Sequence, residues 1–159
     1  MLSSKSPVRV GDEAPDFETV SHTGKPIHLA SYRGKQAVVL FFYPKSDTPV
    51  CSREACGFRD EHAAFAEAGA EVIGVSSDSV KEHQRFAAKY ALPYALISDP
   101  DSELRKLFGV PKSLGLMPGR VTYVIDREGI VQHVFNAPFM AAQHVREALE
   151  TVTRLQAVA

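Results

Sequence analysis

The chain has 159 residues, a net charge of −1, 45% hydrophobic residues and 23% charged residues. A chain of this length and composition fits one domain, 1–159, with a packed core. The near-zero charge predicts neither a nucleic-acid partner nor a membrane surface as partner, and the longest apolar run, 37–43, is too short to cross a bilayer.

The first elements predicted along the chain are extended. The segment 11–17 is rich in turn-forming residues and contains a proline, so we expect an extended segment rather than a helix. A short strand is predicted near 27–29. The run 37–43, Ala-Val-Val-Leu-Phe-Phe-Tyr, is continuously apolar and is stopped by Pro44. Such a run is typical of a central strand that is covered on both faces of its sheet.

A helix is predicted immediately after this strand. Thr48 offers a hydroxyl N-cap, and Pro49 follows at the first helical position, where its missing N–H costs nothing. We expect the helix to run, with a kink, to Ala68, because Gly69 is suited to ending it.

Strands and helices alternate through the second half of the chain. The sequence 79–82 has the form of a capping box and predicts a helix start. A hairpin is expected where two β-branched runs flank Arg127-Glu128-Gly129. In chain order, the predicted elements are a strand at 71–76, a helix from 79, a strand at 94–97, a short helix after Asp99-Pro100, the hairpin strands 121–126 and 130–135, and a final helix over 141–155.

This order predicts an α/β fold. Alternating strands and helices imply parallel crossovers, and the hairpin adds an antiparallel edge. The simplest architecture is a central mixed β-sheet flanked by helices on both faces.

The chain contains two cysteines, Cys51 and Cys56. A small secreted protein held together by disulfides would carry more of them. The first seven residues carry one charge, and no apolar stretch follows them, unlike a secretory signal. We therefore expect redox chemistry or a metal in a reducing compartment, and a cytoplasmic location.

Cys51 lies where the chemistry of a reactive thiol is favoured. Ligands bind at the carboxyl ends of strands in open α/β sheets. With Thr48 as N-cap, Cys51 is the third residue of the helix, near unpaired N–H groups and the positive end of the helix dipole. These groups stabilise a thiolate, which is the nucleophile that a peroxide bond requires. The alternative is an inert buried cysteine that only fills space.

Cys56 cannot pair with Cys51 while the helix is intact. Five helical residues give ~7.5 Å of rise, and the two Cα atoms lie roughly 8 to 9 Å apart. A disulfide requires Cα atoms within ~7 Å. If the two cysteines pair during turnover, the first turns must unwind. The alternative is that Cys56 belongs to the apolar core.

Several motifs together resemble one family. Pro44-x-x-x-Thr48-x-x-Cys51 matches the active-site motif of peroxiredoxins, and 11–17 is similar to their N-terminal signature. The segment 120–126 resembles their arginine-bearing strand, and a second cysteine five positions after the first is the pattern of the bacterioferritin-comigratory (peroxiredoxin Q) subfamily. The resemblance implies a thioredoxin-like fold, reduction of hydrogen peroxide and organic hydroperoxides, recycling by thioredoxin or a similar dithiol donor, no cofactor or metal, and a monomer.

The resemblance also implies a role for each residue of the motif. Cys51 would be the peroxidatic cysteine that becomes a sulfenic acid, and Cys56 would resolve it as an intramolecular disulfide. Thr48 would hydrogen-bond the peroxide, and Pro44 would shield the sulfur from water. Arg120 would hold the thiolate and stabilise the charge on the leaving oxygen.

Plainer roles exist for the same residues. Thr48 is also a helix cap and Pro44 also a strand stop. Spacing alone does not select Arg120, because Arg53, Arg59 and Arg127 are also candidates. Glu54 lies one turn from Cys51, and a surface charge is its default interpretation.

Two other functional classes fit parts of the sequence. A thiol–disulfide oxidoreductase without peroxidase activity would share the fold, but the spacing of Cys51 and Cys56 is C-x-x-x-x-C rather than C-x-x-C. A metal-binding module would use these cysteines and His62. Their spacings fit no common zinc pattern, and no fourth ligand is nearby.

Overall fold

The computed structural model describes residues 7–112 and 118–158. Its centre is a five-stranded sheet in the order β5-β4-β3-β6-β7. The strands are β3 (Ala37–Phe42), β4 (Ala70–Ser76), β5 (Ala95–Ser98), β6 (Val121–Ile125) and β7 (Val131–Asn136). β3, β4 and β5 are parallel, whereas β6 is antiparallel to β3 and to β7. The predicted mixed sheet with an antiparallel edge is therefore confirmed.

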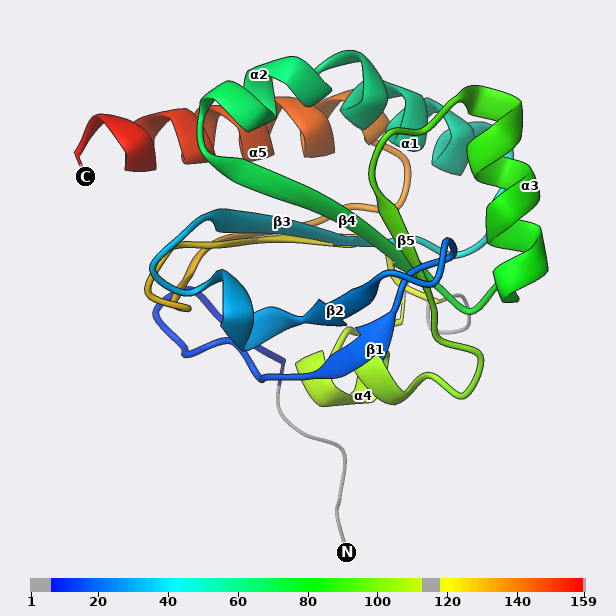
Figure 1. Ribbon diagram of the computed structural model, residues 1–159, viewed down its shortest axis with the longest axis horizontal. Helices are drawn as coiled ribbons and strands as arrows, with labels where there is room; N and C mark the ends of the chain where they lie inside the picture. Colours follow the sequence, from blue (N-terminus) through cyan, green and yellow to red (C-terminus); the bar gives the residue numbers. More distant parts are fainter. Residues whose placement is uncertain (1–6, 113–117, 159) are drawn as a thin grey trace, which may run out of the picture.

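Helices cover both faces of this sheet (Figure 1). One face carries α1 (Pro49–Asp60), α2 (His62–Glu67), α3 (Val80–Tyr90) and α5 (Ala141–Ala157), whose apolar side chains form one core cluster. The other face is covered by the hairpin of β1 (Glu18–Val20) and β2 (Pro26–His28), the 3₁₀-helix η1 (Leu29–Tyr32) and α4 (Glu103–Phe108). The strand β1 was not predicted, because its three residues, Glu-Thr-Val, are too few to show a period.

The strand β3 separates the two cores, as its continuous apolar sequence predicted. All six of its residues are buried. Val39 and Phe41 join the core beneath α1 and α5, whereas Val38, Leu40 and Phe42 join the core beneath the hairpin and α4. Alternate side chains of a strand point to opposite faces, so a central strand needs apolar residues at every position.

α1 and α3 begin at the predicted residues, whereas α4 begins at Glu103 rather than at Asp99-Pro100. The capping box of Ser79 and Glu82 is present at α3, and the predicted kink separates α1 from α2 at Glu61. Thr48 is the N-cap of α1, but its hydroxyl does not cap it. The hydroxyl donates instead to the carbonyl of Lys45 at 2.8 Å, within the preceding loop.

The described residues contain no helix that is long and apolar enough to span a membrane.

Candidate active site

The loop 43–48, which joins β3 to α1, is fixed by contacts with other elements. The carbonyl of Tyr43 accepts a hydrogen bond from Nη2 of the buried Arg105 at 2.7 Å. The backbone N–H of Ser46 donates to Oδ2 of the buried Asp78 at 2.7 Å. Asp47 has a φ of +61° and is held by Nζ of Lys89 at 2.9 Å. The loop therefore has a defined geometry at the carboxyl edge of the sheet.

Cys51 lies in the first turn of α1 and is only 1% exposed. Arg120 reaches it from the edge of the sheet. The antiparallel register pairs Phe42 with Val121, so the residue before Val121 lies beside the end of β3. From there, Nη2 of Arg120 donates to Sγ of Cys51 at 3.1 Å. The contact places the positive charge of a buried guanidinium directly beside the sulfur.

Arg120 is itself buried and has acceptors on each side. Its Nε donates to the carbonyl of Pro138 at 2.8 Å, and its Nη1 pairs with Oε1 of Glu54. Burial acts to lower the pKa of Arg120, but the charges of Glu54 and Cys51 outweigh it and raise that pKa. The guanidinium is thus a permanent positive charge with a fixed orientation.

Glu54 is fully buried, so its interpretation as a surface charge is wrong. It lies on the inward face of α1, three residues after Cys51, because α5 packs against that face. Burial raises the pKa of Glu54 to about 7, although the positive charge of Arg120 acts to lower it. Its second oxygen, Oε2, has no hydrogen-bond partner among the described residues and lies 3.6 Å from Nδ1 of His144.

Of the site residues predicted from the sequence, Cys51 and Arg120 are brought into direct contact. Thr48 and Pro44 are half-buried and lie in the loop that leads into α1. The Thr48 hydroxyl is engaged with the Lys45 carbonyl rather than with the sulfur. The competing candidate Arg53 is exposed.

Cys56 is separated from Cys51 by an intact helix. Both cysteines are free and both belong to the continuous helix α1, as the spacing argument assumed. Cys56 is half-buried, and burial raises the pKa of its thiol, although Arg59 acts to lower it. The two residues cannot form a disulfide in this conformation.

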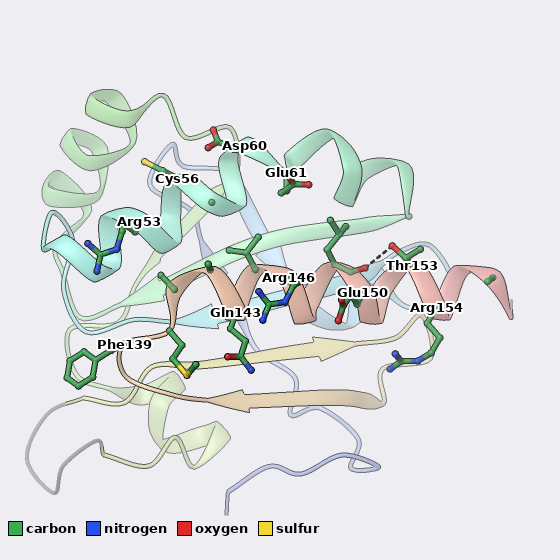
Figure 2. Close-up of a pocket in the computed structure, with 17 residues that line it drawn as sticks. Arg53, Cys56, Asp60, Glu61, Phe139, Gln143, Arg146, Glu150, Thr153 and Arg154 are labelled. Atoms are coloured by element: carbon green, nitrogen blue, oxygen red, sulfur yellow. Dashed lines mark hydrogen bonds between the residues drawn. The ribbon is translucent and has the colours of Figure 1, made fainter.

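Cys56 lines an open groove of about 1360 Å³ between α1 and α5 (Figure 2). Phe139 and Met140, which precede α5, lie at one end of this groove and are 61% and 50% exposed. Cys51 does not line it. Figure 2 shows the sulfur of Cys56 pointing away from α5, so Cys56 borders the groove without directing its thiol across it.

The metal-binding alternative finds no support in the geometry. Within 7–112 and 118–158, no group of three or more His, Cys, Asp or Glu side chains is placed to hold a metal ion. This includes the proposed set of Cys51, Cys56 and His62.

Sequence reasoning missed four buried polar residues around the loop and the sulfur. They are Glu54, Asp78, Arg105 and His144. Apart from the position of Glu54 one turn after Cys51, no local pattern marks them, since each is buried by elements distant in the chain.

The chain is similar to known proteins of one family. The AhpC/TSA family model matches residues 10–134. The chain is 44% identical to a chloroplastic peroxiredoxin Q of Sedum lineare, over 94% of this chain and 80% of that protein. It is 49% identical to one of Arabidopsis thaliana, over 90% and 66% of the two chains.

Solved structures show the same fold. The peroxidoxin BcpB of Mycobacterium tuberculosis superimposes with a TM-score of 0.85 and 37% identity, covering 93% of this chain and 98% of that one. A peroxiredoxin Q of Xanthomonas campestris has a TM-score of 0.82 and 28% identity, covering 95% and 98%. The expected thioredoxin-like fold is confirmed.

The comparisons also correct the expected location and identify the family. The cytoplasmic location is contradicted by the plant relatives, which are named chloroplastic. The residues that build this fold and site do not encode the compartment, so the composition and cysteine count were poor guides to it. The family match and the peroxiredoxin Q relatives lead to one conclusion: the chain belongs to the AhpC/TSA family and is a thiol-dependent peroxidase of the peroxiredoxin type.

Proposed function

We propose that Cys51 is the peroxidatic nucleophile of this peroxidase, that Cys56 resolves it, and that a dithiol protein such as thioredoxin recycles the disulfide. The observation that carries this proposal is the 3.1 Å contact between Nη2 of Arg120 and Sγ of Cys51 in a buried site. Reduction of peroxides by a thiolate needs a deprotonated sulfur and a fixed positive donor beside it.

In the first step the Cys51 thiolate attacks one oxygen of the peroxide. An S–O bond forms as the O–O bond breaks, so sulfur is oxidised to a sulfenic acid and the second oxygen leaves as hydroxide or alkoxide. The proton that the Cys51 thiol gave up on ionising balances this charge, and the leaving group becomes water or an alcohol. Arg120 is placed to donate to the oxygen on which negative charge develops.

Thr48 and Pro44 would complete the site around the peroxide. The hydroxyl of Thr48 would turn from the Lys45 carbonyl toward a peroxide oxygen. Pro44, half-buried at the end of β3, would limit access of bulk water to the sulfur. The fixed loop keeps both side chains in register with Cys51.

In the second step the Cys56 thiolate attacks the sulfenic sulfur of Cys51. A disulfide forms and hydroxide leaves, and the proton released when the Cys56 thiol ionised converts this hydroxide to water. Because both residues lie in α1, part of this helix must unwind first. Unwinding that reaches Glu54 would separate it from Arg120, and reduction of the disulfide would restore this buried pair.

The dithiol donor then exchanges with the disulfide and is itself oxidised. The partial exposure of Cys56 supports this step, because Cys51 is only 1% exposed. We propose hydrogen peroxide and organic hydroperoxides as substrates, a single domain over 1–159, and a monomer as the working unit.

Peroxide consumption with two donors tests this scheme. Wild type, Cys51→Ser and Cys56→Ser are assayed with dithiothreitol, and separately with thioredoxin, thioredoxin reductase and NADPH. We expect no activity from Cys51→Ser with either donor. Cys56→Ser should remain active with dithiothreitol, which resolves the sulfenic acid directly, and should lose its activity with thioredoxin. Equal activity of Cys51→Ser and wild type would overturn the proposal.

A further inference from the structure

The orientation of Arg120 depends on groups beyond the sulfur. Its three nitrogens, Nη2, Nη1 and Nε, each donate to one acceptor. These acceptors are Sγ of Cys51, Oε1 of Glu54 and the carbonyl of Pro138, in that order. A guanidinium is planar and rigid, so fixing two of these acceptors fixes where the third N–H points. The Pro138 carbonyl belongs to the short connection between β7 and α5, which has no regular structure of its own.

His144, in the first turn of α5, holds this connection in place. Its Nε2 lies 2.8 Å from the carbonyl of Ala137, and a carbonyl only accepts, so Nε2 carries the proton. The Ala137 N–H in turn donates to the carbonyl of Arg120 at 3.3 Å. His144 therefore fixes the residue directly before Pro138.

The other ring nitrogen of His144, Nδ1, also has a hydrogen-bond partner. With the proton on Nε2, Nδ1 of the neutral ring is an acceptor, and Oγ1 of Thr122 donates to it at 2.8 Å. Burial lowers the pKa of His144 to about 4, which keeps the ring neutral near pH 7. Oε2 of Glu54, 3.6 Å from Nδ1, receives no proton from it. The side-chain hydrogen bond of Glu54 among the described residues is therefore the one that Oε1 accepts from Arg120.

We propose that His144 is a positioning residue for peroxide reduction. It clamps Ala137 so that the neighbouring Pro138 carbonyl holds Nε of Arg120, and the guanidinium then points Nη2 at the sulfur of Cys51. His144 touches neither the sulfur nor the space beside it and acts only through Arg120. This inference rests on the proposed function of Cys51 and Arg120 and extends it to a residue on the opposite side of the site.

Three substitutions at one position separate the two contacts of the ring. His144→Leu removes both. His144→Gln places an amide donor as far out as Nε2 and can still bond the Ala137 carbonyl. His144→Asn reaches only as far as Nδ1, so it can still meet Thr122 but not Ala137.

The measurement is the second-order rate constant for oxidation of Cys51 by hydrogen peroxide, followed by stopped flow in a single turnover. We expect His144→Leu and His144→Asn to be slower by roughly tenfold to a hundredfold, the usual effect of a small misplacement of a catalytic donor. His144→Gln should stay within about threefold of wild type, because it retains the contact that positions the donor.

A structural control comes from the same helix. Val152, two turns further along α5, is 1% exposed and belongs to the core between α5 and α1. Val152→Ala should lower the urea midpoint of unfolding yet leave the rate constant at its wild-type value. If the role of His144 were purely structural, the rate constant would fall with the urea midpoint in the same way in all four variants, Val152→Ala included.

Two results would overturn the inference: wild-type rate constants in both His144→Leu and His144→Asn, or rescue by Asn but not by Gln. If His144→Leu does not fold, the comparison of Gln with Asn still decides. If the wild-type protein itself shows no fast loss of the Cys51 thiol, the proposed function of Cys51 fails, and the result does not concern His144.

Discussion

Arg120 donates a hydrogen bond from Nη2 to the sulfur of Cys51 at 3.1 Å, although 69 positions separate the two residues in the chain. The contact arises from the register of β3 with β6, which brings the start of one strand to the end of the other. The sheet thereby brings Arg120, which directly precedes β6, to the N-terminus of α1, which carries Cys51.

Replacing Arg120 should slow the reaction with peroxide, and it should also lower stability, because Glu54 loses its buried partner. Arg120→Ala is expected to lower the rate constant for peroxide by about 10²–10³-fold, the cost of losing one well-placed donor. Arg120→Lys should recover little, because an ammonium cannot serve Cys51, Glu54 and Pro138 in one plane. Arg53→Ala, which removes an exposed arginine two residues from the thiol, is the control and should react normally. A wild-type rate for Arg120→Ala would contradict the account.

The helix α1 is expected to lose structure when the enzyme is oxidised. One equivalent of hydrogen peroxide should reduce the helical signal in far-ultraviolet circular dichroism and speed amide exchange within Pro49–Asp60. Cys56→Ser should keep the helix after the same treatment, because its sulfenic acid has no partner to reach. Unchanged amide exchange in oxidised wild type would show that the two cysteines do not pair within one chain.

Glu54 should make stability fall as the pH rises. Burial raises the pKa of Glu54 in the folded state to about 7, whereas the unfolded chain titrates near the usual value of 4.5. The folded state therefore binds this proton more tightly, and its contribution is present below the unfolded pKa and lost as the pH rises toward 7. The free energy of unfolding in urea is measured at pH 5 and at pH 8. Its decrease between these two pH values should be smaller in Glu54→Gln than in the wild type, by on the order of 2 kcal/mol. An equal decrease in the two proteins would show that Glu54 stays ionised throughout.

His83, unlike Glu54, should make stability fall as the pH falls. It is fully buried, with Nε2 2.7 Å from the hydroxyl of Ser76, and burial lowers its pKa to about 4. In the unfolded chain His83 takes up a proton near pH 6.5. The contribution of the neutral ring to the stability of the folded state is therefore complete above pH 6.5 and is lost as the pH falls toward 4. The wild type should lose up to about 3 kcal/mol from this residue between pH 7 and pH 4. His83→Gln, which cannot titrate, should lack that component in urea unfolding; an identical acid profile would contradict the assignment.

The elements that could be predicted are those fixed by local sequence. The run 37–43 gave the central strand because both faces of β3 are covered. The capping box at Ser79 follows from contacts within four residues. The hydrogen-bond partner of the Thr48 hydroxyl could not be predicted, because the Lys45 carbonyl comes within reach only once the loop has folded.

The parts of the site that could not be predicted depend on distant elements. Glu54 has the sequence neighbourhood of an exposed helical residue and is buried only because α5 covers that face of α1. His144 lies 90 positions further along the chain and meets the site through tertiary packing alone. Arg120 was selected by family resemblance, since neither its spacing nor its neighbours distinguish it from Arg53.

The roles of Cys51 and Cys56 are tested by mapping the cysteines with mass spectrometry after one equivalent of hydrogen peroxide. We expect a Cys51–Cys56 disulfide in the wild type, a sulfenic or over-oxidised Cys51 in Cys56→Ser, and no fast reaction in Cys51→Ser. A free Cys51 thiol in wild-type protein while peroxide persists would contradict the assignment of Cys51 as the nucleophile.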